Sequence, residues 1–584
     1  MKTITSFKGY NSRVDPTKLK EGYLVEGSQN VLSTDGENIK IREGTELLGA
    51  ANTALNAIES SYDWKTHSAV ERNLRSYDDE LEVYYDGTWT RVENLWTDVD
   101  FEFAEWWDET EKQDMLMFVN GDANIYAWSG GIAVIDSTTA NTIKKTGTAT
   151  WAEARFTTTD AYGTRQVIIN GSAYGYTGGE GTTTLTGVTG DPTGEADAST
   201  VIQEVGTITN KPASTNNDLI SVLNNQLYIA DFTKRFVYIS KQNDFNTWSP
   251  SSPRVPGEAA LLTLDGYPTA FIVQEEFMYV SAGTDQWYKT LFELSADGTK
   301  EAVNIKRLKT SSQEAAISQG AVCNIKNNVA FVTQENGVDT LGRLENIDTP
   351  RSKPLSDAIK TELIDYTTTN VHTKYFKNNI YIALPSEGKV LIYNLEKGYW
   401  EAPQIMAIRR LAIIDDELCG HSSAVPETYK LFTGHNDNTN PIEAIAKFSY
   451  LQYGDRDRYK SLDEFYSEGY ISSNTDLTLQ LNIDYDGSTS NPEYAIDGAD
   501  EDILFLSVKT VGLGKDKLGE NPLGTTTDDI DELSKFRQID TMVKQDFFEI
   551  QPVYKTNQVD ANWKILAIGS NATYSQNKPI TIKK

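Results

Sequence analysis

The chain has 584 residues, and its 53 Lys and Arg against 84 Asp and Glu give a formal net charge of −31. This acidic balance argues against a dedicated nucleic-acid binder, because neutralising phosphates requires clustered cations. Hydrophobic residues make up 39% of the chain, enough to bury a large core. At ~100–200 residues per domain, the length predicts three or four units.

The sequence also sets expectations about compartment. No run of about 18 apolar residues is present, so we expect no membrane-spanning segment. The first residues, MKTITSFKGYNSR, hold no apolar stretch, so we expect no conventional signal peptide. The two cysteines, Cys323 and Cys419, cannot supply a disulfide framework, which fits assembly in a reducing cytosol.

Residues 1–50 are punctuated by glycines, in GYLVEGSQNV at 22–31 and STDGENIKIREGT at 33–45. Glycine and Asp-Gly between short apolar runs are typical of a tight hairpin turn. We therefore expect an N-terminal arm, 1–50, that contains one hairpin.

A phrase then recurs along the chain: a polar or acidic pair followed within two residues by a short apolar and aromatic run. From Asn225 to Glu276, Asn328 and Asn379 the steps are 51, 52 and 51 residues. Each copy predicts a hairpin with polar residues at its turn. The pairs are Asp78-Asp79, Gln113-Asp114, Asn224-Asn225, Glu275-Glu276, Asn327-Asn328, Asn378-Asn379 and the weaker Asp415-Asp416.

Repeats of about 40–50 residues, each with three or four short strands, are typical of propeller blades. We predict an all-β chain with a degenerate β-propeller of six to eight blades over residues 51–440. The alternative is an ordinary β-sandwich whose hairpins resemble one another by chance. The near-constant step over three intervals favours the propeller.

One gap interrupts the rhythm, because Asp114 and Asn225 are 111 residues apart. The excess, 137–212, is rich in Gly and Thr, with β-branched runs between turns and a strong hairpin signal at Asn170-Gly171. We predict a small β domain inserted in a propeller loop, since loop closure entropy grows slowly with length.

After about residue 441 the phrase stops. Leu477, Leu479, Leu481 and Ile483 alternate with polar residues, which predicts a strand with one buried face. We expect a C-terminal β-sandwich-like module over 441–584. The one helix we expect lies at 354–364, with Ser356 as its N-cap.

The search for catalytic chemistry finds no motif. The four histidines, His67, His372, His421 and His435, lack the spacing of a zinc site, and the cysteines are 96 residues apart. GLGKDKLG at 512–519 lacks the spacing of a phosphate-binding loop, so a plain loop is favoured. DYDG at 484–487 lacks the later ligands of a calcium loop, so a turn is favoured.

Two phrases match a carbohydrate-processing motif only in part. Sialidase-type propellers carry SxDxGxTW phrases, and YYDGTW at 84–89 and SADGTK at 295–300 match them only in part. Asp-Gly at a blade turn is the simpler interpretation. The aromatic pairs Trp106-Trp107 and Tyr399-Trp400 are expected to pack between blades. We predict no catalytic, cofactor-binding or metal-binding residue, no cofactor, and no enzymatic activity.

Several phrases resemble bacteriophage tail nozzle proteins, also called tail tubular proteins of the second kind. SQNVLSTDGENIKIREGT at 28–45 is similar to their N-terminal "N-V … G … R-x-G-T" stretch, which precedes a degenerate propeller. TATWAEARF at 148–156 and the Gly/Thr-rich stretch at 174–188 resemble their small β insertions. SVLNNQLYIA at 221–230, followed by VYIS and NTWS, resembles their blades.

The resemblance implies a virion structural protein of the tail, assembled in the host cytoplasm. Such proteins form a ring, usually sixfold, below the portal and adaptor, which extends the genome-ejection channel and carries fibres. The −31 charge would then line a lumen through which DNA passes without specific binding. Without that context, the charge suppresses non-specific association. The alternative function is a glycan-binding or glycan-degrading propeller, a depolymerase or an adhesin.

Overall fold

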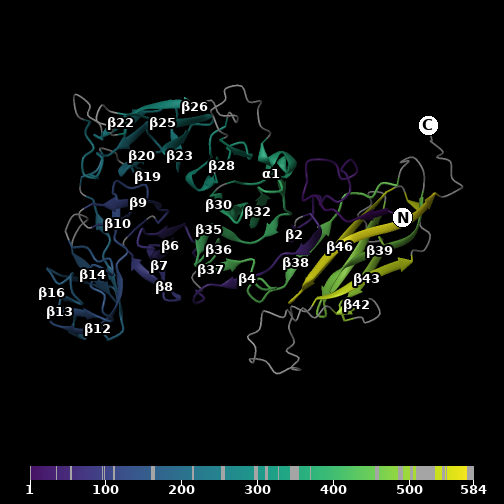
Figure 1. The fold of residues 1–584 in the computed structure, drawn as a ribbon, viewed down its shortest axis with the longest axis horizontal. Coiled ribbons are helices and arrows are strands. Elements are labelled where there is room, and N and C mark those ends of the chain that lie inside the picture. The colour runs from purple at the N-terminus through teal and green to yellow at the C-terminus, as the bar shows by residue number, and fades with distance from the viewer. Residues whose placement is uncertain are drawn as a thin grey trace.

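A computed structural model describes residues 2–574 except 35, 53–55, 95, 98, 110–111, 159–164, 209, 213–215, 251–256, 295–299, 309–313, 327, 342–353, 369, 454–459, 484–490, 500–503, 508–532, 542–545 and 548. This part of the chain is nearly all β, as predicted. A ring of small sheets stands beside a long two-layered region (Figure 1). The helical elements of the described residues are η1 (Pro192–Gly194), η2 (Gln319–Ala321), η3 (Leu355–Ala358), α1 (Lys360–Leu363) and η4 (Pro385–Glu387).

Seven antiparallel sheets follow one another along the chain, and we number them blades 1 to 7. Blade 1 is β5 (Ser60–Lys65), β6 (Glu71–Tyr77), β7 (Glu80–Tyr85) and β8 (Thr88–Glu93). Blade 2 is β9 (Glu102–Asp108), β10 (Gln113–Val119), β11 (Tyr126–Trp128) and β18 (Gly206–Thr207). Blade 3 is β19 (Leu219–Leu223), β20 (Gln226–Ala230), β21 (Phe236–Ile239) and β22 (Ala260–Thr263).

Blades 4 to 7 complete the ring. Blade 4 is β23 (Pro268–Gln274), β24 (Phe277–Ala282), β25 (Gln286–Leu294) and β26 (Lys300–Leu308), and blade 5 is β27 (Val322–Ile325), β28 (Asn328–Val332) and β29 (Val338–Thr340). Blade 6 is β30 (His372–Phe376), β31 (Asn379–Leu384), β32 (Lys389–Asn394), β33 (Tyr399–Trp400) and β34 (Gln404–Ile405). Blade 7 is β35 (Ile408–Ile414), β36 (Glu417–Ser422), β37 (Thr428–Leu431) and β4 (Thr45–Leu47).

The seven blades form a closed propeller. The first strand of each blade contacts the first strand of the next, and β35 of blade 7 contacts β5 of blade 1. A buried apolar cluster lies between each pair of neighbouring blades. The N-terminal strand β4 pairs with β37 as the outermost strand of blade 7, so the two ends of the propeller share one sheet.

In blades 2 to 7 the repeated polar pairs fall at or directly after the turn between the first and second strands. In blade 1 the pair Asp78-Asp79 lies one strand later, at the turn between β6 and β7. At Asn224-Asn225 and Asp415-Asp416 both residues have positive φ, between 52° and 61°. Two-residue hairpins favour such left-handed turns, and Asn and Asp tolerate them because their side chains bond locally. The sequence period therefore reports the hairpin spacing of the blades.

The inserted module lies between the third and fourth strands of blade 2. Its sheet covers 132–203, a shorter and earlier range than the expected 137–212, because β18 belongs to blade 2. Trp151 and Phe156 stack edge to face in its own core. Its strands are β12 (Ile132–Thr139), β13 (Thr142–Lys145), β14 (Gln166–Ile169), β15 (Ser172–Gly175), β16 (Thr184–Thr186) and β17 (Thr200–Gln203).

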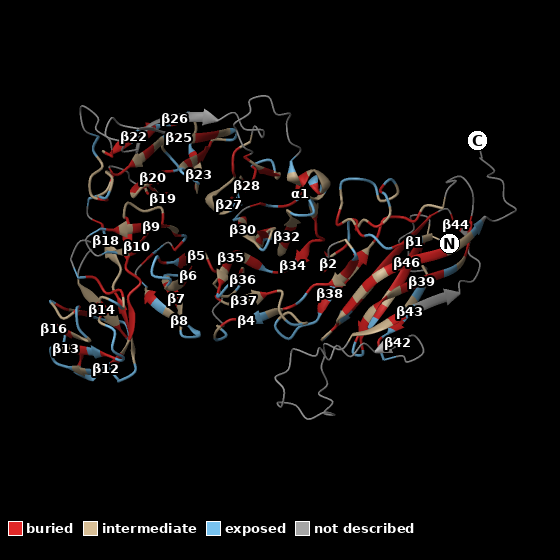
Figure 2. Ribbon diagram, in the orientation of Figure 1, coloured by how far each residue is buried: buried red, intermediate tan, exposed pale blue. Residues whose placement is uncertain are grey.

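The C-terminal region is a sandwich of two sheets whose facing side chains share one core, with Tyr554 and Ser467 hydrogen-bonded across it at 2.6 Å. Figure 2 shows buried residues along its long strands. One sheet is β1 (Lys2–Ile4), β2 (Val31–Thr34), β3 (Asn38–Ile41), β39 (Lys460–Ser472), β42 (Leu504–Ser507), β43 (Leu533–Thr541), β44 (Asp546–Phe547), β46 (Trp563–Tyr574); the other is β38 (Ile442–Lys447), β40 (Asp476–Ile483), β41 (Glu493–Asp497), β45 (Ile550–Gln558).

Residues 1–50 join the two regions. The β2–β3 hairpin extends the sandwich, and β4 completes the propeller. Between them, the fully buried Arg42 donates to the side chain of Asn30 at 3.0 Å, to the carbonyl of Ile405 at 3.2 Å and to Asp437. A Cβ on Gly44 would lie 2.0 Å from the carbonyl oxygen of Asn436, so only glycine fits.

The expected helix at 354–364 is broken into η3 and α1. Ser356 is not its N-cap but lies inside η3, where its hydroxyl accepts from the Val338 amide at 2.9 Å. The side chain therefore anchors the segment to blade 5.

Candidate functional site at the propeller axis

A cavity of about 410 Å³ lies at the propeller axis, lined by side chains on or next to the first strands of six blades. Its wall is mixed. Tyr62 and Phe103 stack with ring centroids 5.2 Å apart, and Asp63, Glu102 and Lys374 add ionisable groups. A polar cavity of this size with aromatic surface can hold a small ligand.

Ion pairs cross the axis between blades that are distant in sequence. Lys374 of blade 6 donates to Asp63 of blade 1, whose carboxylate also accepts from the Ile413 amide of blade 7 at 2.8 Å. Arg410 of blade 7 donates to Asp100, next to blade 2, at 2.8 Å. These contacts tie blades 6, 7, 1 and 2 together on the axial side.

Burial changes the protonation of two groups in this cavity. It raises the pKa of Glu102 to about 8, with a smaller contribution from the charge of Asp100, whereas Arg410 acts in the opposite direction. Burial also lowers the pKa of His372 well below its ordinary value, and nearby Arg410 and Lys374 lower it further. At neutral pH, Glu102 is therefore a protonated donor and His372 is neutral.

This arrangement places Glu102, a carboxyl with a raised pKa, near the carboxyl of Asp100, and such a pair can serve general acid catalysis. His372 does not act as a free base, because its Nδ1 accepts from the Leu411 amide at 3.1 Å. Within the ranges that the structure covers, no group of three or more His, Cys, Asp and Glu could hold a metal ion.

The other histidines are dispersed. His421 is fully buried, with Nδ1 2.9 Å from the Thr428 hydroxyl, and burial lowers its pKa. His67 contacts Asp114 and the edge of Trp107. His435 lies in the connection that follows blade 7.

Cys323 and Cys419 are both free and buried in blades 5 and 7, and burial raises the pKa of each thiol to about 12. Neither is a thiolate nucleophile at neutral pH.

The partial motifs have structural places. YYDGTW forms the β7–β8 hairpin, where Asp86 and Gly87 have positive φ. Trp106 packs between blades 2 and 3 against Phe245, and Trp400 donates to the Leu355 carbonyl at 2.8 Å. GLGKDKLG, DYDG and the SADGT of SADGTK lie outside the described residues.

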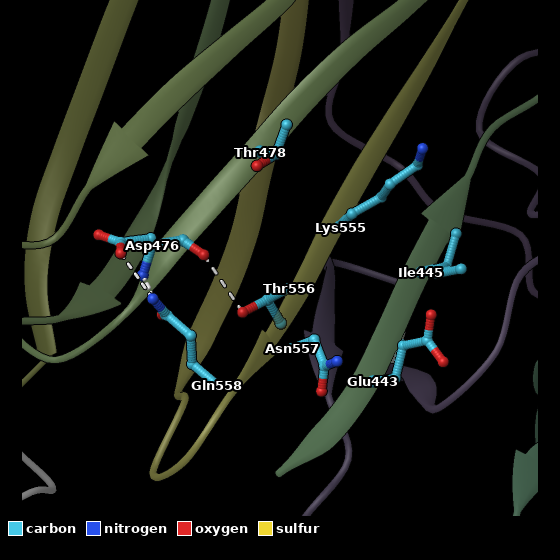
Figure 3. A pocket seen from close by; sticks show the side chains of 8 residues that line it. All are labelled: Glu443, Ile445, Asp476, Thr478, Lys555, Thr556, Asn557 and Gln558. Atoms are coloured by element: carbon cyan, nitrogen blue, oxygen red, sulfur yellow. Dashed lines mark hydrogen bonds between the residues drawn. The ribbon is translucent and has the colours of Figure 1, made fainter. Parts of the chain in front are cut away.

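A second cavity, of about 360 Å³, lies on the sandwich across β38, β45 and β40 (Figure 3). Here Gln558 donates to the carboxylate of Asp476 at 2.5 Å, and Thr556 donates to the Asp476 carbonyl at 3.2 Å. Glu443 and Lys555 stand on the neighbouring strands. The hollow is polar and open, without the aromatic surface of the axial cavity.

The sequence search missed the axial groups because each stands alone in its own blade. Asp63, Glu102, Lys374 and Arg410 share no spacing, and only closing the ring brings them together. The repeat contains a usable signal for two of them, since Lys374 and Arg410 lie a few positions before the polar pairs Asn378-Asn379 and Asp415-Asp416 of their blades.

No family model and no curated protein matches the chain. Among solved structures, the computationally designed Ika8 protein is 10% identical, with a TM-score of 0.33, over 66% of this chain and 100% of that one. BBS1N in complex with ARL6DN, soaked with mercury, is 10% identical, with a TM-score of 0.35, over 67% and 96%. The lead-soaked form of the same complex is 11% identical, with a TM-score of 0.33, over 67% of this chain and 97% of that one. The fold assignment therefore rests on the sheet connectivity.

No helix in the parts of the chain that are placed is long and apolar enough to cross a membrane.

Proposed function

We propose that the chain is a structural subunit of a phage tail, a nozzle or head-to-tail component. In this role it assembles into an oligomeric ring around the DNA-ejection channel and offers a platform for tail fibres. The adaptor and the fibres are its expected partners, and the virion tail is its expected location.

The observation that carries this proposal is the place of the phrase at 28–45. Asn30, Arg42, Gly44 and Thr45, which make up its resemblance to nozzle proteins, are the residues that join the sandwich to the propeller. A phrase with this role belongs to a scaffold. It fits a protein whose purpose is a fixed shape.

A buried network supports the same view. Burial raises the pKa of Glu401 to about 8, so this side chain is neutral at pH 7 while it accepts from the Ser33 amide of the sandwich at 2.7 Å. Tyr10 and Tyr366 both donate to Glu362, and Lys389 donates to the Tyr366 hydroxyl at 2.8 Å. Two modules held in this way move as one body, as a conduit subunit must.

The test is assembly. We expect the purified chain, alone or with the adaptor of the same tail, to form rings in negative-stain electron microscopy and to sediment as a single large species. Sixfold averages with an open centre are the expected result. A chain that stays monomeric with its tail partners and is absent from purified tails contradicts the proposal.

The axial cavity supports a second candidate, a glycan-binding or glycan-degrading propeller. Glu102 would be the general acid and Asp100 the second carboxylate, with the Tyr62–Phe103 stack as the sugar platform.

This candidate is tested by release of reducing ends from host surface polysaccharide. Glu102→Gln is expected to abolish release, and Lys397→Glu on the propeller surface is the control. If wild type releases no sugar and binds no polysaccharide, the second candidate fails.

A further inference from the structure

The first twenty residues are basic in an otherwise acidic chain. They hold four lysines and one arginine against one aspartate, a net charge of +4, so residues 21–584 carry −35. Two of these lysines, Lys8 and Lys20, line a hollow of about 430 Å³ together with Thr3–Ser6, Glu21 and Gln452. We call this surface the basic hollow and include the neighbouring Lys18.

The basic hollow is built on a fixed frame. Gln452 donates to the Thr17 carbonyl at 2.7 Å, and Ser449 donates to the Lys20 carbonyl at 3.0 Å, so the loop at 15–20 is held against the sandwich. Lys18 and Lys20 are exposed, and among the described residues neither forms an ion pair. Their charges face solvent in a defined position.

The hollow of Figure 3 has the opposite sign. Glu443 and Asp476 are exposed at its rim, and Asp497, paired with Asp476 in the neighbouring strand, is exposed as well. Lys555 is the one basic residue in its lining, and it donates to Gln480. We call this surface the acidic hollow.

The two hollows lie at opposite ends of the same strand. Next to the basic hollow, Leu451 bridges to Ile550 at the start of β45, whereas Gln558 at the end of β45 lines the acidic hollow. Eight residues of extended strand span about 26 Å. A surface and its complement on different parts of one chain form a heterologous contact, which generates a ring if the rotation between copies closes and an open filament if it does not.

We propose that the basic hollow of one copy docks on the acidic hollow of the next copy, and that this contact builds the ring. The proposal rests on the ring of the proposed function and adds which surfaces meet. The second copy is the partner that charge complementarity favours. A duplex would meet a chain of net charge −31, whose long-range field repels phosphates.

The experiment uses the full chain and two charge reversals. Lys18→Glu with Lys20→Glu reverses the basic hollow, and Glu443→Lys with Asp476→Lys reverses the acidic one. All four side chains are exposed, so both variants are expected to fold with wild-type circular dichroism. Matched controls change the same charge elsewhere: Lys360→Glu with Lys397→Glu, and Asp197→Lys with Glu396→Lys.

Each hollow variant alone is expected to associate roughly tenfold or more weakly than wild type in sedimentation velocity, and the controls to assemble normally. An equimolar mixture of the two hollow variants restores complementary charges at every contact and is expected to recover rings. Wild-type rings are expected to loosen between about 0.1 M and about 1 M NaCl, as the screening length falls.

Two failures are distinguishable. If wild type never forms rings with its tail partners, the proposed function falls, and this contact falls with it. If wild type forms rings but either reversal assembles like its control, only the assigned contact is overturned. If added duplex DNA restores ring assembly in the Lys18→Glu with Lys20→Glu variant, the assigned contact is also overturned.

Discussion

Two contacts between neighbouring blades differ sharply. Blades 1 and 2 meet through a large aromatic cluster in which Phe118 packs edge to face on Phe101 and Trp96, with Trp64 and Trp128 beside it. Blades 7 and 1 meet through a small apolar cluster of Leu48, Ala412, Ile414 and Cys419. The second contact closes the ring.

Polar contacts replace apolar area at the closing contact. Arg75 of blade 1 donates to Glu82 at 2.7 Å and to the Thr428 hydroxyl of blade 7 at 3.0 Å, and Arg409 pairs with Glu59. Directional groups of this kind specify one register, while apolar area supplies most of the free energy. The propeller thus separates the contact that stabilises it from the contact that fixes its blade number.

Removing residues 1–47 is expected to have the largest effect. The deletion leaves β37 without β4 and takes β1, β2 and β3 from the sandwich, so two sheets gain open edges. We expect an insoluble or protease-sensitive chain, scored by soluble yield and limited trypsin digestion. A truncated chain that melts like wild type would show that closure does not depend on β4.

Phe118→Ala tests the apolar contact. The side chain is fully buried, and its removal should cost about 3–5 kcal/mol of unfolding free energy. Urea unfolding followed by tryptophan fluorescence measures the loss. The smaller change Phe118→Leu is the control and is expected to cost less than half as much; equal costs for the two variants would contradict a cost set by the size of the cavity.

Arg75→Met tests the closing contact and should cost about 3 kcal/mol, because the buried Glu82 loses its charged partner. Arg75→Met with Glu82→Leu is expected to recover most of this loss, since no buried charge is then left. If the double variant is as unstable as the single one, packing rather than charge holds this contact.

Glu102→Gln should have the smallest effect, and one that depends on pH. The fold raises the pKa of Glu102 from 4.5 to about 8, so this residue supports the fold fully below pH 4.5 and loses that support as the pH rises through 8. Relative to wild type, Glu102→Gln should be roughly 1–3 kcal/mol more stable at pH 9 and unchanged at pH 4. Thermal melts of both proteins at pH 4 and pH 9 measure this stability difference. The same difference at both pH values would contradict the prediction.

The sequence predicted the parts of the fold that depend on local turn chemistry. Asn224-Asn225 and Asp415-Asp416 mark hairpins because their left-handed turns restrict residue choice. It could not predict where the N-terminal strands go, because β4 and β37 are separated by almost 400 residues and their pairing carries no local pattern. For the same reason the axial site, with Asp63 and Lys374 more than 300 residues apart, was invisible.

The pairing of residues 1–47 with strands made much later also delays part of folding. Lys2 pairs with Ser570, so β1 waits for a partner strand that is made more than 560 residues later. At ~5–20 residues per second, that wait is roughly half a minute to two minutes. During this interval β1 and the β2–β3 hairpin lack β46, the strand that both pair with in the finished sheet. The sandwich therefore reaches its final form only once β46 has been made, because β1, β3 and β39 all pair with that strand.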